Sequence, residues 1–174
     1  MAESEAAADP VEAARAIVLR SLSTAPRTRS QLAESLASRG VPEDVATATL
    51  DRFEELGLID DAEFAQMWVR SRHQRKGLSR RALRHELGKK GVPKENIDSA
   101  LADVDEDSEY RAALGFAQRK VRSMSALETE ARRRRLMGAL ARRGYSSGLS
   151  ARVAREVLAD QAEDVDVADD YLVE

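Results

Sequence analysis

The sequence predicts an all-α protein built from three tandem three-helix repeats. The first observation is a pattern of two leucines four residues apart, then a glycine and an apolar residue, which occurs three times at intervals of about fifty residues. The three copies are Leu32/Leu36/Gly40/Val41, Leu83/Leu87/Gly91/Val92 and Leu136/Leu140/Gly144/Tyr145. The second is composition: aromatic residues make up 4% of the chain and prolines number four, which favours helices over strands. Repeats of this length favour an elongated array over one compact globule.

Each glycine in the pattern marks the end of a helix. Two leucines four residues apart lie on one helix face, and the glycine supplies the left-handed backbone in which helices commonly end. In a Schellman ending, the residue after the glycine meets the residue five positions before it. The expected pairs are Leu36 with Val41, Leu87 with Val92 and Leu140 with Tyr145.

The first repeat, residues 10–58, carries start and stop signals for three helices. Asp9 can cap a helix in which Pro10 takes the first position, where its missing N–H costs nothing. This helix is expected to end near Ser23. The next two helices are bounded by Thr28 or Ser30 and Gly40, and by Pro42 and Gly57.

The second repeat, residues 59–106, begins at Asp60, which has the spacing of a capping box with Glu63. Its three helices are bounded by Asp60 and Gly77, by Ser79 and Gly91, and by Pro93 onward. Four of its larger apolar residues have the spacing of a buried face, so they are expected to form its core, with the tryptophan filling volume rather than stacking on a base. They are Phe64, Trp68, Leu83 and Leu87.

The third repeat, residues 107–160, follows the same plan less regularly. Its inward apolar positions are Tyr110, Leu114, Ala117 and Val121, then Leu136 and Leu140, then Leu149, Val153 and Val157. Acidic tails are expected at both ends of the chain, over residues 1–9 and 161–174, and the second is expected to be frayed or weakly helical.

Blocks of charge matter more than the net charge of −3. Between residues 70 and 90, basic residues are opposed by one acid, Glu86; the basic residues are Arg70, Arg72, Arg75, Lys76, Arg80, Arg81, Arg84, Lys89 and Lys90. Like charges three and four residues apart on a helix repel each other. We therefore expect this first basic set to bind an acidic protein surface or DNA phosphate.

A second basic patch lies in the third repeat and comprises Arg132, Arg133, Arg134, Arg135, Arg142 and Arg143. Four consecutive arginines point in all directions around a helix and cannot form one face. For this patch, both binding and simple solvation stay open.

Catalytic and metal-binding functions have little support. Cysteine is absent, which excludes disulfides and thiolate metal sites and suits the cytoplasm. His73 and His85 are the only histidines, and neither has a second ligand at a metal-binding spacing. No apolar stretch approaches the roughly twenty residues of a membrane span, and the N-terminus does not resemble a signal peptide. We expect a cytoplasmic protein without enzyme activity, cofactor or metal, and a monomer because a repeat array needs no dimer.

One stretch of the second repeat resembles the RecX family of bacterial recombination regulators. In one register it combines Asp61-x-x-Phe64-Ala65, Trp68, the pair Arg70 and Arg72, Lys76-Gly77, Glu86-Leu87 and Lys90-Gly91. Weaker similarity in the other repeats extends it over roughly residues 10–158. The resemblance implies a curved protein of three tandem three-helix repeats that binds the RecA recombinase filament on DNA. It also implies inhibition of RecA's ATP hydrolysis and strand exchange in recombination, repair and the SOS response.

Two other functions are compatible with the sequence. A short turn with glycine between two helices is also the geometry of a helix-turn-helix transcription factor, although Asn and Gln, which often contact adenine, are scarce near the basic residues. A helical scaffold with another client is the other alternative. Binding of single- or double-stranded DNA without sequence specificity is compatible with the basic blocks.

Overall fold

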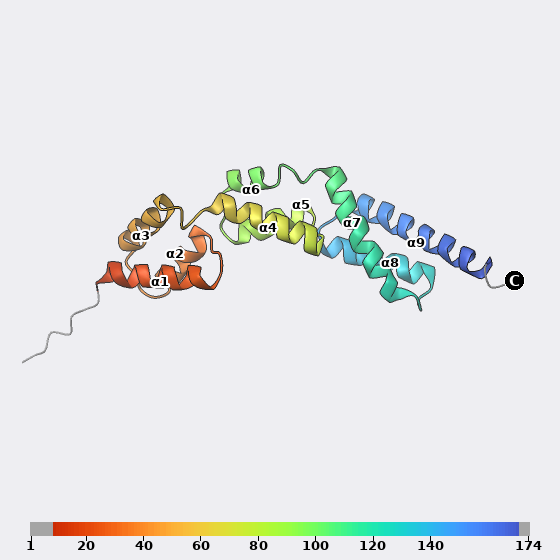
Figure 1. The fold of residues 1–174 in the computed structure, drawn as a ribbon, viewed down its shortest axis with the longest axis horizontal. Coiled ribbons are helices and arrows are strands. Elements are labelled where there is room, and N and C mark those ends of the chain that lie inside the picture. The colour runs from red at the N-terminus through yellow and green to blue at the C-terminus, as the bar shows by residue number, and fades with distance from the viewer. Residues whose placement is uncertain (1–8, 171–174) are drawn as a thin grey trace, which may run out of the picture. The chain divides into compact units, whose positions relative to one another are not determined.

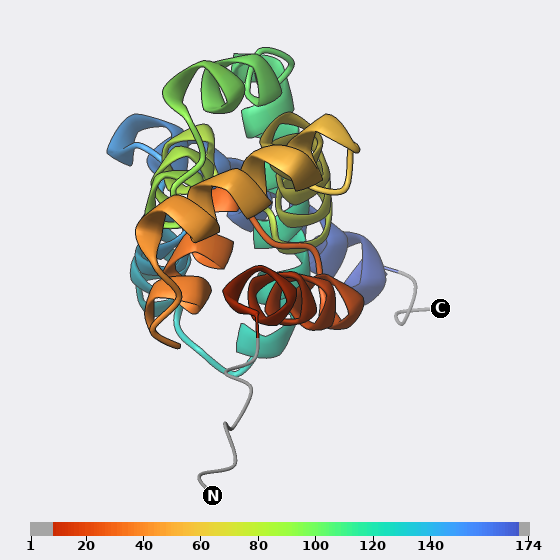
Figure 2. The same ribbon diagram turned by 90° about the vertical axis from the view of Figure 1, so that its left-hand side faces the viewer.

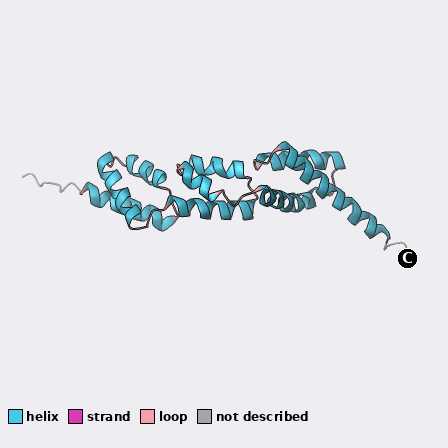
Figure 3. Ribbon diagram, turned by 90° about the horizontal axis from the view of Figure 1, so that it is seen from above, coloured by secondary structure: helices cyan, strands magenta, loops and turns pink. Residues whose placement is uncertain are grey.

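The computed structural model describes residues 9–170, with side chains through residue 161. Every regular element in this range is a helix, as Figure 3 shows, which confirms the predicted all-α class. The elements are α1 (Pro10–Thr24), α2 (Arg29–Ala37), α3 (Glu43–Glu55), α4 (Asp61–Lys76), α5 (Arg80–Lys89), α6 (Lys94–Ala100), α7 (Glu106–Val121), the 3-10 turn η1 (Arg122–Met124), α8 (Thr129–Arg142) and α9 (Ser147–Asp170). Taken in threes, the α-helices of this range agree in number and order with the helices predicted for the three repeats (Figure 1).

The predicted tails are covered only in part. Residues 1–8 and 171–174 lie outside the described residues. The backbone of α9 continues as a helix to Asp170, through most of the tail predicted to start at residue 161.

Glycine ends the second helix of each repeat, as predicted. The φ angles of Gly40, Gly91 and Gly144 are 75°, 72° and 90°. The N–H after each glycine donates to the leucine carbonyl five residues earlier, which is the Schellman hydrogen bond. The pairs are Val41 with Leu36 at 3.2 Å, Val92 with Leu87 at 3.2 Å and Tyr145 with Leu140 at 3.3 Å.

Most helix starts agree with the sequence. Asp9 accepts from the N–H of Val11 at 3.0 Å, and Asp60 accepts from that of Glu63 at 2.8 Å. Of the two candidate caps for α2, the structure uses Thr28, in a capping box with Gln31. The turn η1, which buries Met124 after α7, has no counterpart in the prediction.

Within the described residues the chain forms two compact units, and the division passes through the second repeat. The first unit contains residues 9–68 and 86–100, and the second contains residues 69–85 and 101–170. In the first, α1, α2 and α3, coloured red to orange in Figure 2, pack around Val18, Leu32, Leu36, Leu50 and Phe53. In the second, α7, α8 and α9 pack around Val121, Leu136, Leu140, Tyr145 and Val153.

Of the four residues expected in the core of the second repeat, three are buried as predicted. Phe64, Leu83 and Leu87 are buried, but Trp68 is only half-buried. The indole Nε1–H donates to Glu86 at 2.8 Å, and the Lys90 ammonium lies 4.2 Å from the ring centroid. A tryptophan with a polar partner on its N–H and a cation on its face is best placed at the edge of a core. The prediction that Trp68 is a core residue was therefore wrong.

Candidate binding surfaces and the joints between repeats

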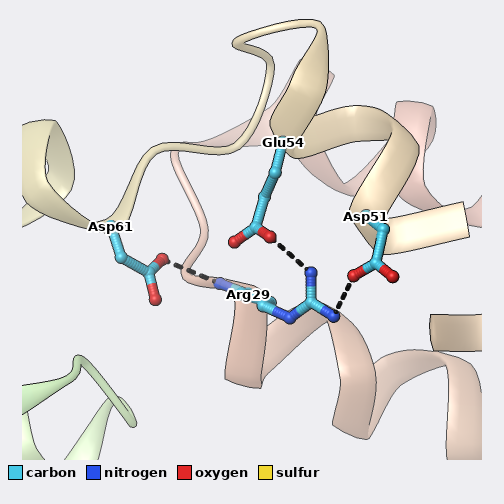
Figure 4. A network of polar contacts seen from close by, with 4 residues as sticks. All are labelled: Arg29, Asp51, Glu54 and Asp61. Atoms are coloured by element: carbon cyan, nitrogen blue, oxygen red, sulfur yellow. Dashed lines mark hydrogen bonds and ion pairs between the residues drawn. The ribbon is translucent and has the colours of Figure 1, made fainter. Parts of the chain in front are cut away.

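A joint within the first unit links the first repeat to the second. Thr28 Oγ1 accepts from the N–H of Gln31 at 3.2 Å and donates to the carbonyl of Lys90 at 2.6 Å. The N–H of Arg29 donates to Oδ1 of Asp61 at 2.9 Å, as Figure 4 shows. The first N–H groups of a helix have no partner inside that helix. Here, residues of the second repeat complete the start of α2.

The side chain of Arg29 reaches back to its own repeat. Its guanidinium pairs with Asp51 at 2.7 Å and Glu54 at 2.6 Å, both on α3 (Figure 4). Burial raises the pKa of the Asp61 carboxyl, although the N–H and the positive charge of Arg29 act in the opposite direction.

A joint within the second unit repeats this arrangement between the second and third repeats. The N–H of Ser79 donates to the carbonyl of Arg143 at 3.0 Å, and the N–H of Arg80 donates to Glu109 at 2.8 Å. The hydroxyl of Tyr145 adds a bond to the carbonyl of Gly77 at 2.9 Å. Burial raises the pKa of Tyr145 well above its ordinary value, so this hydroxyl stays a donor.

The repeated glycine lies at both joints. A Cβ added to Gly91 would collide with the side chain of Ser30, and one added to Gly144 would collide with Ser79. Gly40 does not lie at a joint, and a Cβ added to it would have no other atom within 4 Å. The glycine at each joint therefore ends its helix and also leaves the space that a serine side chain of the preceding repeat occupies.

The first basic set lies on α4, on α5 and just after α5. Six members are exposed, namely Arg70, Arg75, Lys76, Arg80, Arg81 and Lys89. Three are half-buried, namely Arg72, Arg84 and Lys90. Among the residues that the structure describes, five of these side chains have neither a carboxylate within 4 Å nor a hydrogen bond or a contact with an aromatic ring: Arg70, Arg75, Lys76, Arg81 and Lys89. Lys89 and Lys90 belong to the first unit and the other seven to the second.

Three arginines of this set, Arg80, Arg81 and Arg84, border one shallow cavity of about 380 Å³. Glu109 of α7 borders the same cavity. The count of charges along the sequence found only Glu86 nearby, because it could not detect an acid from the next repeat. This cavity is therefore less uniformly cationic than the sequence suggested.

The second basic patch divides into two groups. The guanidinium of Arg132 donates to the carbonyls of Leu127 and Ser125, both at 2.7 Å, which holds the turn before α8. Arg133 pairs with Glu130 at 2.8 Å, and the Arg143 guanidinium lies 3.9 Å from the ring centroid of Phe116. The remaining members border a depression of about 590 Å³, which we call the α7–α8 groove. Its lining is Lys120, Ser123, Met124, Arg134, Arg135, Gly138 and Arg142.

Other expectations concern the histidines and the membrane. Nδ1 of His73 lies 2.9 Å from the carbonyl of Leu78, so this ring helps to hold the turn at Gly77. Among the described residues, no three His, Cys, Asp or Glu side chains gather at a spacing that could hold a metal ion. In the same part of the chain, no helix has the length and apolar character needed to span a membrane.

One cationic surface was missed by the sequence analysis. Arg20, Arg27 and Arg39 border a cavity of about 310 Å³ in the first repeat, together with the hydroxyl residues Ser21 and Thr24. These arginines are separated along the chain and form no block of charge. Only the packing of α1 against α2 brings them together.

Comparison with known proteins decides the family. Models of the first, second and third three-helix domains of RecX match residues 14–53, 60–101 and 107–153, in that order. The chain belongs to the RecX family. The resemblance found in the second repeat is thereby confirmed and extends to all three.

Relatives of this RecX-family chain match along most of its length. It is 51% identical over 158 residues to regulatory protein RecX of Streptomyces coelicolor, covering 91% of this chain and 84% of the relative. It is 48% identical to regulatory protein RecX of Mycobacterium avium, covering 87% and 88%. The crystal structure of RecX from Lactobacillus salivarius has the same fold, with a TM-score of 0.73 at 21% identity over 86% of this chain and 97% of that one. The relatives are regulatory proteins, in agreement with the prediction of a regulator rather than an enzyme.

Proposed function

We propose that this protein binds the filament that the RecA recombinase forms on DNA and inhibits its ATP hydrolysis and strand exchange. The observation that carries the proposal is the match to all three RecX domains, with 51% identity to a RecX regulatory protein over 91% of the chain. The alternative of a helix-turn-helix transcription factor loses its support, because the three-helix units that suggested it are matched in order as RecX domains.

The first basic set is the proposed contact with the filament. Five of its side chains have no carboxylate within 4 Å, no hydrogen bond and no ring contact among the described residues, so their charge is available to an acidic protein surface. A protein that binds one state of the filament more tightly than another favours that state. Holding the filament in one state would oppose the changes that ATP turnover requires.

Further properties belong to the same proposal. The repeats are taken as residues 10–58, 59–106 and 107–160, an assignment supported by the matched ranges, each of which falls inside one repeat. We propose a cytoplasmic monomer that contacts single- or double-stranded DNA, without sequence specificity, as part of the nucleoprotein filament.

The test is a titration of this protein into active RecA on single-stranded DNA, with ATP hydrolysis and filament assembly as readouts. Hydrolysis is expected to fall as the protein is added. The variant Arg75→Gln/Lys76→Gln should require a higher concentration, because it loses two available charges. The matched control is Arg15→Gln/Arg52→Gln, which removes two arginines that already pair with Glu12 and Glu55. Unchanged hydrolysis and unchanged assembly at saturating wild-type protein would exclude the proposal.

A further inference from the structure

We propose that the α7–α8 groove is a nucleic-acid site that binds the sugar-phosphate backbone without distinguishing base sequence. The inference rests on the proposed function in one respect: it assigns the nucleic acid, one of the two components of the filament, to a specific surface of the third domain. It also goes further, because the groove should bind a polynucleotide in the absence of any recombinase.

Charge is the first argument. Lys120 comes from α7 and Arg134, Arg135 and Arg142 come from α8, two helices that pack against each other in the second unit (Figure 1). Within the described part of the chain, none of the four has a carboxylate within 4 Å, and no acidic residue lines the groove. Four cations around one depression repel each other until an anion enters.

The contrast with neighbouring arginines is the second argument. Arg132, Arg133 and Arg143 lie beside the groove residues in sequence, yet each is committed to carbonyls, to Glu130 or to the ring of Phe116. The arginines that line the groove make no ion pair within 4 Å and no side-chain hydrogen bond to another described residue, although the carboxylate of Glu130 attracts Arg134 electrostatically. The patch that seemed undirected from sequence is therefore sorted by the fold into supporting arginines and available ones.

The lining also indicates the chemical class of the ligand. Three of the four cations are arginines, whose planar guanidinium binds phosphate through two parallel hydrogen bonds. Interfaces with nucleic acid are polar and strongly basic, whereas the centres of protein interfaces are depleted of charge and enriched in aromatic side chains. The groove contains no aromatic residue on which a base could stack. Contacts to phosphate alone carry no sequence information.

Glycine contributes to the form of the groove. At Gly138 an added Cβ would lie 3.4 Å from Nη1 of Arg142, so the guanidinium of Arg142 folds back along α8 over this residue. The side chain of Met124, from η1, is buried and also borders the groove.

The experiment measures binding of the full-length protein to labelled oligonucleotides across a salt series, with no recombinase present. The arms are a thymine-only single strand, a mixed-sequence single strand, a duplex and polyglutamate. Four phosphate contacts on a single strand give a slope of log K against log salt of about −2.8. The variant Arg134→Gln/Arg135→Gln should reduce that slope to about −1.4 and weaken binding roughly tenfold at low salt.

The matched control is Arg111→Gln/Arg133→Gln, which removes the same charge at exposed positions outside the groove and should bind like the wild type. Equal affinity for the two single strands is expected, and the duplex arm shows which form of backbone the groove accepts. Tighter binding to polyglutamate than to any oligonucleotide would overturn the inference in favour of an acidic protein ligand. So would equal losses in the groove variant and the control.

The two proposals fail independently. If the wild type binds no bare oligonucleotide but still inhibits RecA, the groove assignment is wrong and the proposed function stands. If oligonucleotides bind through the groove but ATP hydrolysis by RecA is unaffected, the proposed function is wrong and the groove assignment stands.

Discussion

Gly40 and Gly91 have nearly the same backbone conformation but different surroundings. Their φ angles are 75° and 72°, yet only Gly91 faces a side chain of another repeat, that of Ser30. The pair therefore separates the cost of a left-handed backbone from the cost of a close contact.

Replacement of Gly40 by alanine should lower the free energy of unfolding by about 1 to 2 kcal/mol, the usual cost of placing a side chain in this conformation. Gly91→Ala should lose about 1 to 3 kcal/mol more, because its methyl group must displace Ser30 or shift the joint. Urea denaturation of both variants measures the difference. Equal losses would show that the joint tolerates a side chain.

Asp61 and Asp105 have pKa shifts of opposite sign. Burial raises the pKa of Asp61, so the folded state holds its proton more tightly than the unfolded state does. The stabilisation that Asp61 contributes to the folded state is fully present below its ordinary pKa and is lost as the pH rises through the raised pKa. The N–H of Ser108 lowers the pKa of Asp105, so its stability is present above its ordinary pKa and is lost as pH falls through the lowered value.

Asparagine at either position removes the titration but keeps an oxygen that can accept the same N–H. Between about pH 3 and about pH 6, the stability of Asp61→Asn relative to the wild type should therefore rise with pH. That of Asp105→Asn should fall. Urea denaturation across this range gives both curves. Curves of the same sign would contradict the assigned causes of the two shifts.

The helix starts show how one side chain connects two repeats. Thr28 caps α2 as an acceptor and joins the next repeat as a donor, and it is fully buried. A hydroxyl can do both, whereas a carboxylate only accepts. The N-cap of α2 therefore needs a hydroxyl, although Asp is as good a cap for an isolated helix.

Thr28→Ser keeps both hydrogen bonds and should lose about 1 kcal/mol or less, for the buried methyl group. Thr28→Asp keeps the cap but sets a carboxylate against the carbonyl of Lys90, and it should lose about 2 kcal/mol or more. Thermal unfolding of the two variants compares them. If Thr28→Asp is as stable as Thr28→Ser, the bond across the joint contributes little.

Helix boundaries were predictable because their causes are local. Caps and glycine endings depend on residues within about five positions, and the sequence displays them directly. The position of Trp68 was judged wrongly, and the proximity of Glu109 to the arginines of α5 was overlooked, because both depend on partners from other helices. The α7–α8 groove could be located only in part, since helical spacing alone does not show which arginines already have partners.

At the scale of the whole molecule, repeats are not independent bodies. The compact units divide the second repeat, because its residues take part in joints with both neighbours. Three repeats were visible in the sequence as a period. The hydrogen bonds by which one repeat completes the helix start of another could not be seen in the sequence, because they join residues far apart along the chain.

The period also predicts an elongated protein. Three fifty-residue units in a row would span about 75 Å, whereas a compact globule of this length has a radius of gyration near 16 Å. Small-angle X-ray scattering of the isolated protein should therefore give a radius clearly above that value. A result near 16 Å would contradict the extended arrangement.

The joints give the chain a direction. At each one, the unsatisfied start of a helix belongs to the earlier repeat, and the groups that complete it belong to the later one. A ribosome releases the N-terminus first, so the earlier repeat emerges before its completing partners have been made. The hydroxyl of Thr28 cannot bond to the carbonyl of Lys90, nor the N–H of Ser79 to that of Arg143, until those later residues have been synthesised. Each earlier repeat therefore lacks these bonds until the later repeat has been made, and a premature stop codon that deletes the later repeat also removes them from the one before it.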